Sequence, residues 1–206
     1  MVVFFWHFAN AFLPQSVDPY NGKPGIIGTP YFFLLNGHAA VMVFFTLSGF
    51  VLTLKYFIKN DSSLITTGIV KRYFRLLGPV LLTIMSSWLL FELNLFKYLQ
   101  AGAITGSPWL KDFGGSFRGE KFNASFTGAL SQSFITVFFK GETYYCTNLW
   151  TMKYELIGSF IAILIAPSLI KSNKKQQTII LLLSTLILFY SGPLYICFIA
   201  GSFLAF

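Results

Sequence analysis

Charged residues are scarce in this sequence of 206 residues: they make up 11% of the chain, whereas hydrophobic residues make up 55%. A water-soluble fold would leave too much of that apolar surface uncovered, so the composition excludes soluble classes. The two cysteines lie in segments of opposite polarity, Cys146 in a polar one and Cys197 in an apolar one, and predict no disulfide framework. A glycine-rich phosphate loop, a CxxC or HExxH metal pattern and a GxSxG elbow are also missing, so we expect no metal site.

Long uncharged runs are present instead. The clearest is His38–Leu54, HAAVMVFFTLSGFVLTL, which together with its flanks reaches the roughly 20 apolar residues that a helix needs to cross a bilayer. This predicts an all-α, multi-pass transmembrane helix bundle in a lipid bilayer, a single membrane domain over residues 1–206 with about five to six spans. Apolar segments reach both ends, so we expect a domain truncated at both ends.

Basic residues predict the orientation of the bundle. They cluster in two segments between apolar runs, Lys55–Arg75 and Lys171–Lys175, and Asp61 is the only acidic residue in either segment. This pattern is typical of short cytoplasmic loops. The net charge of +8 therefore indicates membrane topology, and we expect no nucleic acid partner.

The resulting prediction places the spans along the chain. Residues 1–13 are expected to be the outer part of a first helix, and further helices are expected over 37–57, 76–96, 148–170 and from 178 onward. A break at Ser191–Pro193 predicts either a sixth helix or one kinked helix. Residues 97–147 are expected to form an exterior loop with a partly embedded segment over 129–139.

Ionisable side chains inside spans are functional candidates because burying them is costly. His7 lies six residues before Leu13, roughly 9 Å inside the outer end of the first helix. Glu155 lies five residues after Trp150, roughly 8 Å below the outer surface, and His38 lies at an outer helix end, so we expect one shared layer. His7 then accepts a proton from a substrate hydroxyl with help from Glu155, or it merely bonds a neighbouring helix. For His38 an interfacial role is favoured.

A basic motif, KRYFR, contains Lys71, Arg72 and Arg75. Arg72 and Arg75 are spaced i and i+3, which places them on one side of a helix, where guanidinium groups can grip phosphate oxygens. The more common use of such residues is as an anchor at anionic headgroups. Ser48 precedes Gly49 in an LSGF motif and favours close helix packing.

Five pieces of the sequence, taken in order, resemble the acyltransferase 3 family of multi-pass membrane O-acyltransferases. They are VVFFWHF around His7, VMVFFTLSGFVL around Ser48, KRYFRLLGP, LWTMKYELIGSF around Glu155, and FIAGSFLAF at the end. The resemblance implies transfer of an acyl group, usually acetyl, from cytoplasmic acyl-CoA to a hydroxyl of an extracytoplasmic glycan or lipid-linked sugar. Acyl-CoA is then the donor substrate, and no cofactor is expected.

The same resemblance implies roles for individual residues. His7 is expected to be catalytic, either as a base or as a transient acyl carrier, and the basic motif is expected to meet the phosphates of acyl-CoA through Lys71, Arg72 and Arg75. The expected supporting or acceptor-side residues are His38, Ser48, Trp150 and Glu155. A bacterial inner membrane is the expected location, with a eukaryotic endomembrane as the alternative.

Two other classes of function stay open. A transporter or channel would line a pathway with the same polar residues, stacked through the depth of several helices. A catalytically inactive membrane bundle would use them for packing alone. Members of the family carry further spans and an arginine ahead of the catalytic histidine that this chain does not contain, so activity is expected of a longer parent.

Overall fold

The computed structural model describes residues 1–17, 25–61, 63–111 and 123–206. The described residues form helices joined by turns and loops, without strands among them, which confirms the predicted all-α class. Within these ranges three helical segments are long and apolar enough to cross a bilayer, Gly37–Lys59, Thr67–Glu92 and Thr147–Lys171. Shorter apolar helices accompany them, and together they form a membrane helix bundle.

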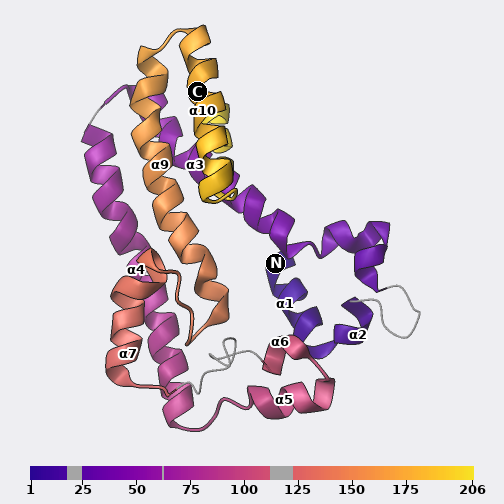
Figure 1. The fold of residues 1–206 in the computed structure, drawn as a ribbon. Helices are drawn as coiled ribbons and strands as arrows, with labels where there is room; N and C mark the ends of the chain where they lie inside the picture. Colours follow the sequence, from indigo (N-terminus) through magenta and orange to yellow (C-terminus); the bar gives the residue numbers. More distant parts are fainter. Residues whose placement is uncertain (18–24, 62, 112–122) are drawn as a thin grey trace.

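The described helices follow one another along the chain (Figure 1). The first half contains α1 (Val2–Phe12), α2 (Pro14–Val17), η1 (Ile26–Gly28), η2 (Pro30–Leu34), α3 (Gly37–Lys59) and α4 (Ser63–Glu92). The second half contains α5 (Tyr98–Thr105), α6 (Pro108–Lys111), α7 (Phe126–Ser131), η4 (Gln132–Thr136), α8 (Val137–Phe139), η5 (Thr147–Trp150), α9 (Thr151–Lys171), α10 (Lys174–Ser191) and α11 (Tyr195–Ala205). η4 is a π-helical turn, and η1, η2 and η5 are short 3₁₀ helices.

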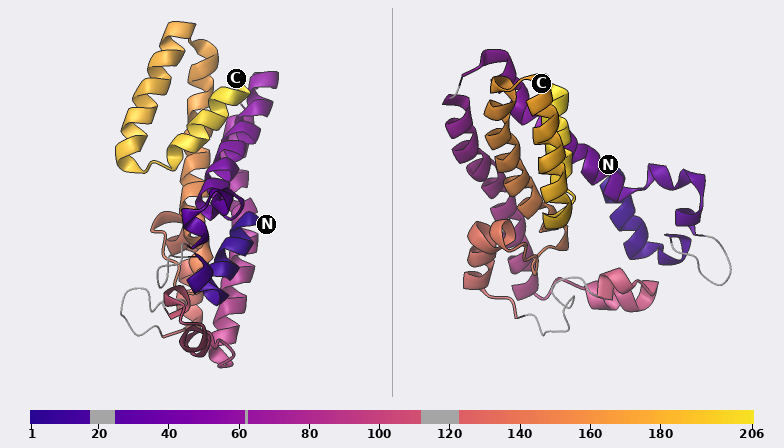
Figure 2. Two further views of the ribbon diagram at one scale, coloured as in Figure 1. Left: turned by 90° about the vertical axis from the view of Figure 1, so that its right-hand side faces the viewer. Right: turned by 45° about the horizontal axis from the view of Figure 1, so that its top comes forward.

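Helices α3, α9 and α11 form the centre of the bundle (Figure 2). α3 and α11 cross closely because both carry glycine at the crossing: a Cβ atom on Gly49 would overlap the backbone of Phe198, and one on Gly201 would overlap the backbone of Thr46. Beside the crossing, the rings of Phe45 and Phe198 stack with centroids 4.9 Å apart. Small residues that let helix backbones approach are the usual means of packing in a membrane.

The ends of several helices agree with the sequence prediction. α3 begins after Asn36, whose side chain accepts a hydrogen bond of 2.9 Å from the backbone N–H of Ala39. It ends at Asn60, which adopts the left-handed conformation with φ 50°. The predicted break near residues 191–193 is confirmed as a turn between two separate helices, α10 and α11, rather than a kink.

Helix α4 differs from its prediction. The sequence predicted a helix over 76–96, starting after the basic motif, but α4 begins at Ser63 and ends at Glu92. Lys71 therefore lies eight residues, roughly 12 Å, inside the helix. The segment 63–75 contains no proline, and its charged side chains are tolerated in a helix because Arg72 pairs with Glu155 while Lys71 and Arg75 are exposed.

The predicted embedded segment over 129–139 belongs to a helical stretch, Phe126–Phe139, formed by α7, η4 and α8. Its buried residues Ala129, Val137 and Phe138 join Ile84 of α4 and Leu156 of α9 in one core cluster. Burial of these apolar side chains fixes the long segment after α4 against the bundle.

The two basic segments lie at the same end of the bundle. The α3–α4 and α9–α10 connections are both at the top of Figure 1, together with the C-terminus, and α2, α5 and α6 lie at the bottom. The rings of Phe57 and Phe206 meet there with centroids 5.1 Å apart. This arrangement is the one expected if the basic end faces the cytoplasm.

Candidate functional site

His7 borders two adjoining cavities of about 680 Å³ and about 560 Å³. Both are lined by Trp6, His38, Asn148 and Trp150 as well as by His7, and we refer to them together as the histidine cavity. The structure thus brings three predicted site residues, His7, His38 and Trp150, to one place. The volume is that of a small-molecule site, with apolar walls and a few polar groups.

Packing at the start of α3 sets the spacing of the two histidines. Gly37 lies under the indole of Trp6, and a Cβ atom on Gly37 would come within 2.7 Å of Trp6 Cδ1. Glycine is therefore what allows α1 to lie against α3 at this point. The neighbouring residues His7 and His38 are placed on the same cavity as a result.

The His7 ring is held by stacking. It lies over the indole of Trp109, from α6, with ring centroids 5.2 Å apart and planes 26° apart. Neither of its ring nitrogens has a hydrogen-bond partner among the residues that the structure describes. An imidazole with an unoccupied nitrogen can accept a proton from a hydroxyl placed beside it.

The far end of α1 is tied down by a few polar contacts. Ser107 donates a hydrogen bond of 2.6 Å from its hydroxyl to the carbonyl oxygen of Asn10, and the Asn10 side chain donates one of 2.7 Å to the carbonyl oxygen of Trp6. These contacts link the turn of α1 that carries His7 to the start of α6, the helix that carries Trp109.

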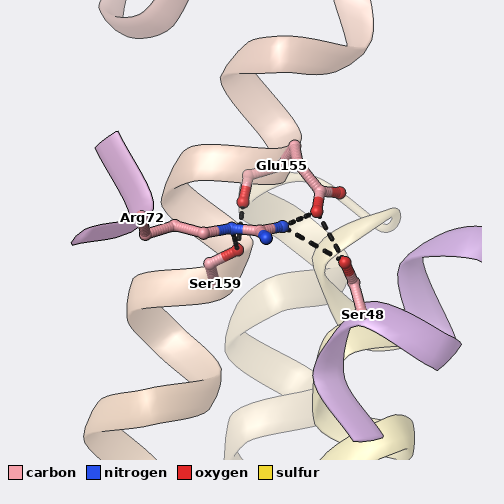
Figure 3. Close-up of polar contacts among 4 residues, drawn as sticks. All are labelled: Ser48, Arg72, Glu155 and Ser159. Carbon is pink, nitrogen blue, oxygen red and sulfur yellow. Dashed lines mark hydrogen bonds and ion pairs between the residues drawn. The ribbon is translucent and has the colours of Figure 1, made fainter. Parts of the chain in front are cut away.

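Four polar side chains meet inside the bundle, and we refer to them as the buried cluster: Ser48 of α3, Arg72 of α4, and Glu155 and Ser159 of α9 (Figure 3). Arg72 Nη2 forms an ion pair with Glu155 Oε1 and donates a hydrogen bond of 3.2 Å to Ser48 Oγ. Arg72 Nε donates to Ser159 Oγ over 2.9 Å, and Ser48 donates to Glu155 Oε1 over 2.5 Å. Ser159 in turn donates to the carbonyl oxygen of Glu155.

The buried cluster is neutral overall but not fully satisfied. Arg72 is 8% exposed and Glu155 is 1% exposed, so both charges are removed from solvent and depend on each other. The second carboxylate oxygen of Glu155, Oε2, is buried and has no hydrogen-bond partner among the described residues. A buried acceptor left unpaired is costly, and such groups are rare in native structures.

A smaller cavity of about 260 Å³ lies nearer the basic end of the bundle. We refer to it as the inner cavity. It is lined by three cationic side chains, Lys55, Lys71 and Arg75, together with apolar and small residues of α3, α4 and α9, and none of its lining residues is acidic. A cavity with three positive charges and no carboxylate favours an anionic ligand.

The structure separates residues that the sequence placed together. Glu155 was predicted to share a layer with His7 and His38, but its contacts are with Arg72, and its other partner, Ser48, lies ten residues along α3 from His38, roughly 15 Å. The carboxylate is thus not the group that orients His7. The error comes from measuring depth along one helix, which ignores how α9 is inclined to the others.

Arg72 and Arg75 are also separated. Their spacing predicted one shared helix face, yet only Arg75 lines the inner cavity, whereas Arg72 points into the bundle toward α9. The phosphate contact of Arg72 was predicted from its spacing to Arg75 and from the family resemblance, and in the structure Arg72 is 8% exposed and paired with Glu155. Lys71 and Arg75 remain accessible for the predicted role.

Sequence reasoning missed three contributors to these sites. Ser159 has a detectable signal, since it lies four residues after Glu155 and therefore on the same helix face. Lys55 was recognised only as a topology signal. Trp109 has no sequence signal, because it comes from a polar stretch whose path cannot be read from periodicity.

These features define a helical membrane protein with a buried ion pair, a histidine-lined cavity and a cation-lined cavity. The chain belongs to the acyltransferase 3 family, whose model, described as an acyltransferase domain, matches residues 1–206. This confirms the family resemblance and indicates acyl transfer as the activity. No curated protein and no solved structure matches the chain.

Proposed function

We propose that this protein transfers an acyl group, most simply acetyl, from acyl-CoA to a hydroxyl of a glycan or lipid-linked sugar, in a bacterial inner membrane. The acceptor hydroxyl binds in the histidine cavity, and the phosphates of the donor bind in the inner cavity. The observation that carries this proposal is His7, whose ring nitrogens have no hydrogen-bond partner among the described residues and which lies at the wall of a cavity large enough for a sugar.

The inner cavity supports the donor end of the proposal. Lys55, Lys71 and Arg75 come from two helices and converge on one space. Ammonium and guanidinium groups are the usual partners of phosphate oxygens, and three of them offset much of the charge of a nucleotide. Arg72 already holds Glu155, so we assign the phosphate contacts to the three residues that line the cavity.

The chemistry requires one proton acceptor. His7 takes the proton of the acceptor hydroxyl while the oxygen attacks the thioester carbonyl; the carbon–sulfur bond then breaks, and the coenzyme A thiolate leaves and recovers the proton from the imidazolium. In the alternative route a ring nitrogen of neutral His7 attacks the thioester carbonyl, the carbon–sulfur bond breaks, and the coenzyme A thiolate leaves with the proton of the acylimidazolium. The acceptor hydroxyl then attacks the acylimidazole, the carbon–nitrogen bond breaks, and the hydroxyl proton returns to His7. His38 and Trp150, on the same cavity, are the residues placed to position the acceptor.

A transport function is the second candidate, and one observation favours it. Polar side chains occur at three successive depths, in the inner cavity, the buried cluster and the histidine cavity. A pathway for a polar solute would have the same arrangement. Covalent transfer distinguishes the two functions, because a transporter leaves its solute unchanged.

The test is acyl transfer in inside-out membrane vesicles given acetyl-CoA labelled in the acetyl group. We expect label to enter the lumenal glycan or lipid fraction as an alkali-labile ester, and we expect His7→Ala to lower the rate by about 100-fold to 10,000-fold, as for loss of a general base. Unchanged labelling in His7→Ala would exclude His7 as base or carrier. Absence of any transfer by the unaltered protein would exclude the enzyme.

Phe5→Ala is the matched control. Phe5 lies on the same helix, is 48% exposed, and lines neither part of the histidine cavity. Its truncation should leave the rate within about 2-fold, because exposed substitutions away from a site have small effects. Equal membrane levels of both variants show that the comparison concerns chemistry.

A further inference from the structure

The buried cluster lies between the two cavities along α3. On this helix the histidine cavity reaches as far as Phe44, and the inner cavity starts at Val51. Ser48, which bonds Glu155 and Arg72, lies between these two positions. The gap from Phe44 to Val51 is seven residues, roughly 10 Å of helix.

The same order is found along α9. The histidine cavity reaches Thr151, the inner cavity starts at Ile163, and Glu155 and Ser159 lie between them. On both α3 and α9, the buried cluster therefore lies between the two cavities. A ligand that extends from one cavity to the other along α3 and α9 passes the level of these four side chains.

In the proposed reaction, the donor acyl-CoA has to occupy both cavities at once. Its phosphates and its thioester are joined by the pantetheine arm, an uncharged chain about as long as a four-residue peptide, which extends to about 13 Å. This length lies between the two separations of the cavities, roughly 10 Å from Phe44 to Val51 on α3 and roughly 18 Å from Thr151 to Ile163 on α9. The arm contains two secondary amides, and each offers an N–H donor that must be satisfied when water is excluded.

The buried cluster offers the complementary acceptor. Glu155 Oε1 is occupied by Arg72 and Ser48, but Oε2 is buried and unpaired. An amide N–H of the pantetheine arm can donate a hydrogen bond to Oε2 without breaking the ion pair at Oε1, because the two carboxylate oxygens of Glu155 are separate acceptors. The free-energy cost of burying Oε2 without a hydrogen bond is then removed only when the arm is bound.

We propose that the buried cluster is the binding site for the pantetheine arm, in which Glu155 Oε2 accepts a hydrogen bond from an amide N–H of the arm. This inference rests on the proposed function, since it takes acyl-CoA as the donor. Glu155 is a positioning residue in this scheme: it holds the arm in register so that the thioester reaches the histidine cavity.

The test compares ligands on the unaltered, detergent-solubilised protein. Coenzyme A is measured against an analogue in which an amide N–H of the arm is replaced by an ester oxygen, one analogue for each amide. We expect one analogue to bind about 10-fold to 100-fold more weakly, as for loss of a hydrogen bond to a charged group. Equal affinity of coenzyme A and both analogues would overturn the inference.

Glu155→Gln identifies the acceptor. A carboxamide is a weaker acceptor, so this variant should discriminate less than about 3-fold between coenzyme A and the ester analogue. Discrimination that persists in Glu155→Gln would assign the amide to another residue and overturn the inference. If Glu155→Gln does not insert, the double variant Arg72→Gln with Glu155→Gln carries the comparison, because it leaves no unpaired buried charge. Glu92→Gln, an exposed carboxylate on α4, is the control.

Adenosine 3′,5′-bisphosphate separates failure of the inference from failure of the proposed function. This probe carries the phosphates without the arm, so it should bind Glu155→Gln and the unaltered protein equally and should bind Lys71→Gln more weakly. Binding of the probe without discrimination between the arm analogues overturns the inference alone. If neither the probe nor coenzyme A binds the unaltered protein, the proposed function fails and the inference fails with it.

Discussion

The histidine cavity and the buried cluster differ in how firmly they are held. In the cluster, four hydrogen bonds and ion pairs join three helices, and the side chains of Arg72, Glu155 and Ser159 are buried. In the histidine cavity, the described residues hold His7 by one ring stack, and α1 is held by the packing of Trp6 on Gly37 and by one hydrogen bond from Ser107 to the carbonyl oxygen of Asn10. The histidine lies on a lightly attached helix, whereas the ion pair lies in the core.

This difference separates stability from activity. Local regions with few buried contacts open at low free energy, and binding sites are drawn from them. A buried ion pair behaves differently, because removing one partner leaves the other charge buried without a counter-charge, which destabilises the whole fold. We therefore expect substitutions in the buried cluster to act mainly on folding, and those around His7 to act mainly on turnover.

The largest expected effect is that of Arg72→Leu. It leaves the Glu155 carboxylate buried without its charge partner and should lower the free energy of unfolding by about 3–5 kcal/mol. Thermal unfolding in detergent measures it. The double variant with Glu155→Leu should recover most of the loss, because no unpaired charge remains. A single-variant loss below about 1 kcal/mol would show that the pair contributes little.

An intermediate effect is expected for Gly37→Leu. The new side chain collides with Trp6 and moves α1 away from α3, so the rate of acyl transfer should fall by about 100-fold, as for misplacement of a reacting group by about 1 Å. The unfolding free energy should change by only about 1–2 kcal/mol.

Gly78→Leu is the matched control, since a Cβ atom on Gly78 meets nothing within 4 Å. It should leave the rate and the stability of the protein close to those of the unaltered chain. Equal rates in the Gly37 and Gly78 variants would contradict the role assigned to the contact between α1 and α3.

The smallest effect is expected for Ser107→Ala. It removes the hydrogen bond to the carbonyl oxygen of Asn10 and should cost about 1 kcal/mol of stability with a several-fold lower rate. Ser172→Ala, which removes an exposed hydroxyl from the α9–α10 turn, should change neither property measurably. A rate unaffected by Ser107→Ala would mean that this tie does not position His7.

Hydropathy and charge predicted the class of fold and most helix ends, because the bilayer imposes length and polarity on each span. The predicted start of α4 was wrong because the positive-inside pattern indicates where the membrane surface lies and not where a helix begins. A helix continues through basic residues wherever the backbone has no breaker, as it does from Ser63 to Arg75.

The site was predicted in part. His7 and His38, which were predicted to share a layer, line one cavity together with Trp150. The pairing of Glu155 with Arg72 was not predictable from depth alone, because it depends on which face each helix turns inward. Trp109 enters the site from α6, a four-residue helix too short to leave a periodic signal in the sequence.

The crossing of α3 and α11 has a mechanical consequence. The two backbones are in direct contact at Gly49 and Gly201, so neither helix can slide or rotate without a steric clash. We therefore expect α3 and α11 to move together as one rigid unit. Ser48 is the residue next to Gly49 and is anchored with it. Any widening between the two cavities is then expected to come from the other helices around them and not from the crossing of α3 and α11.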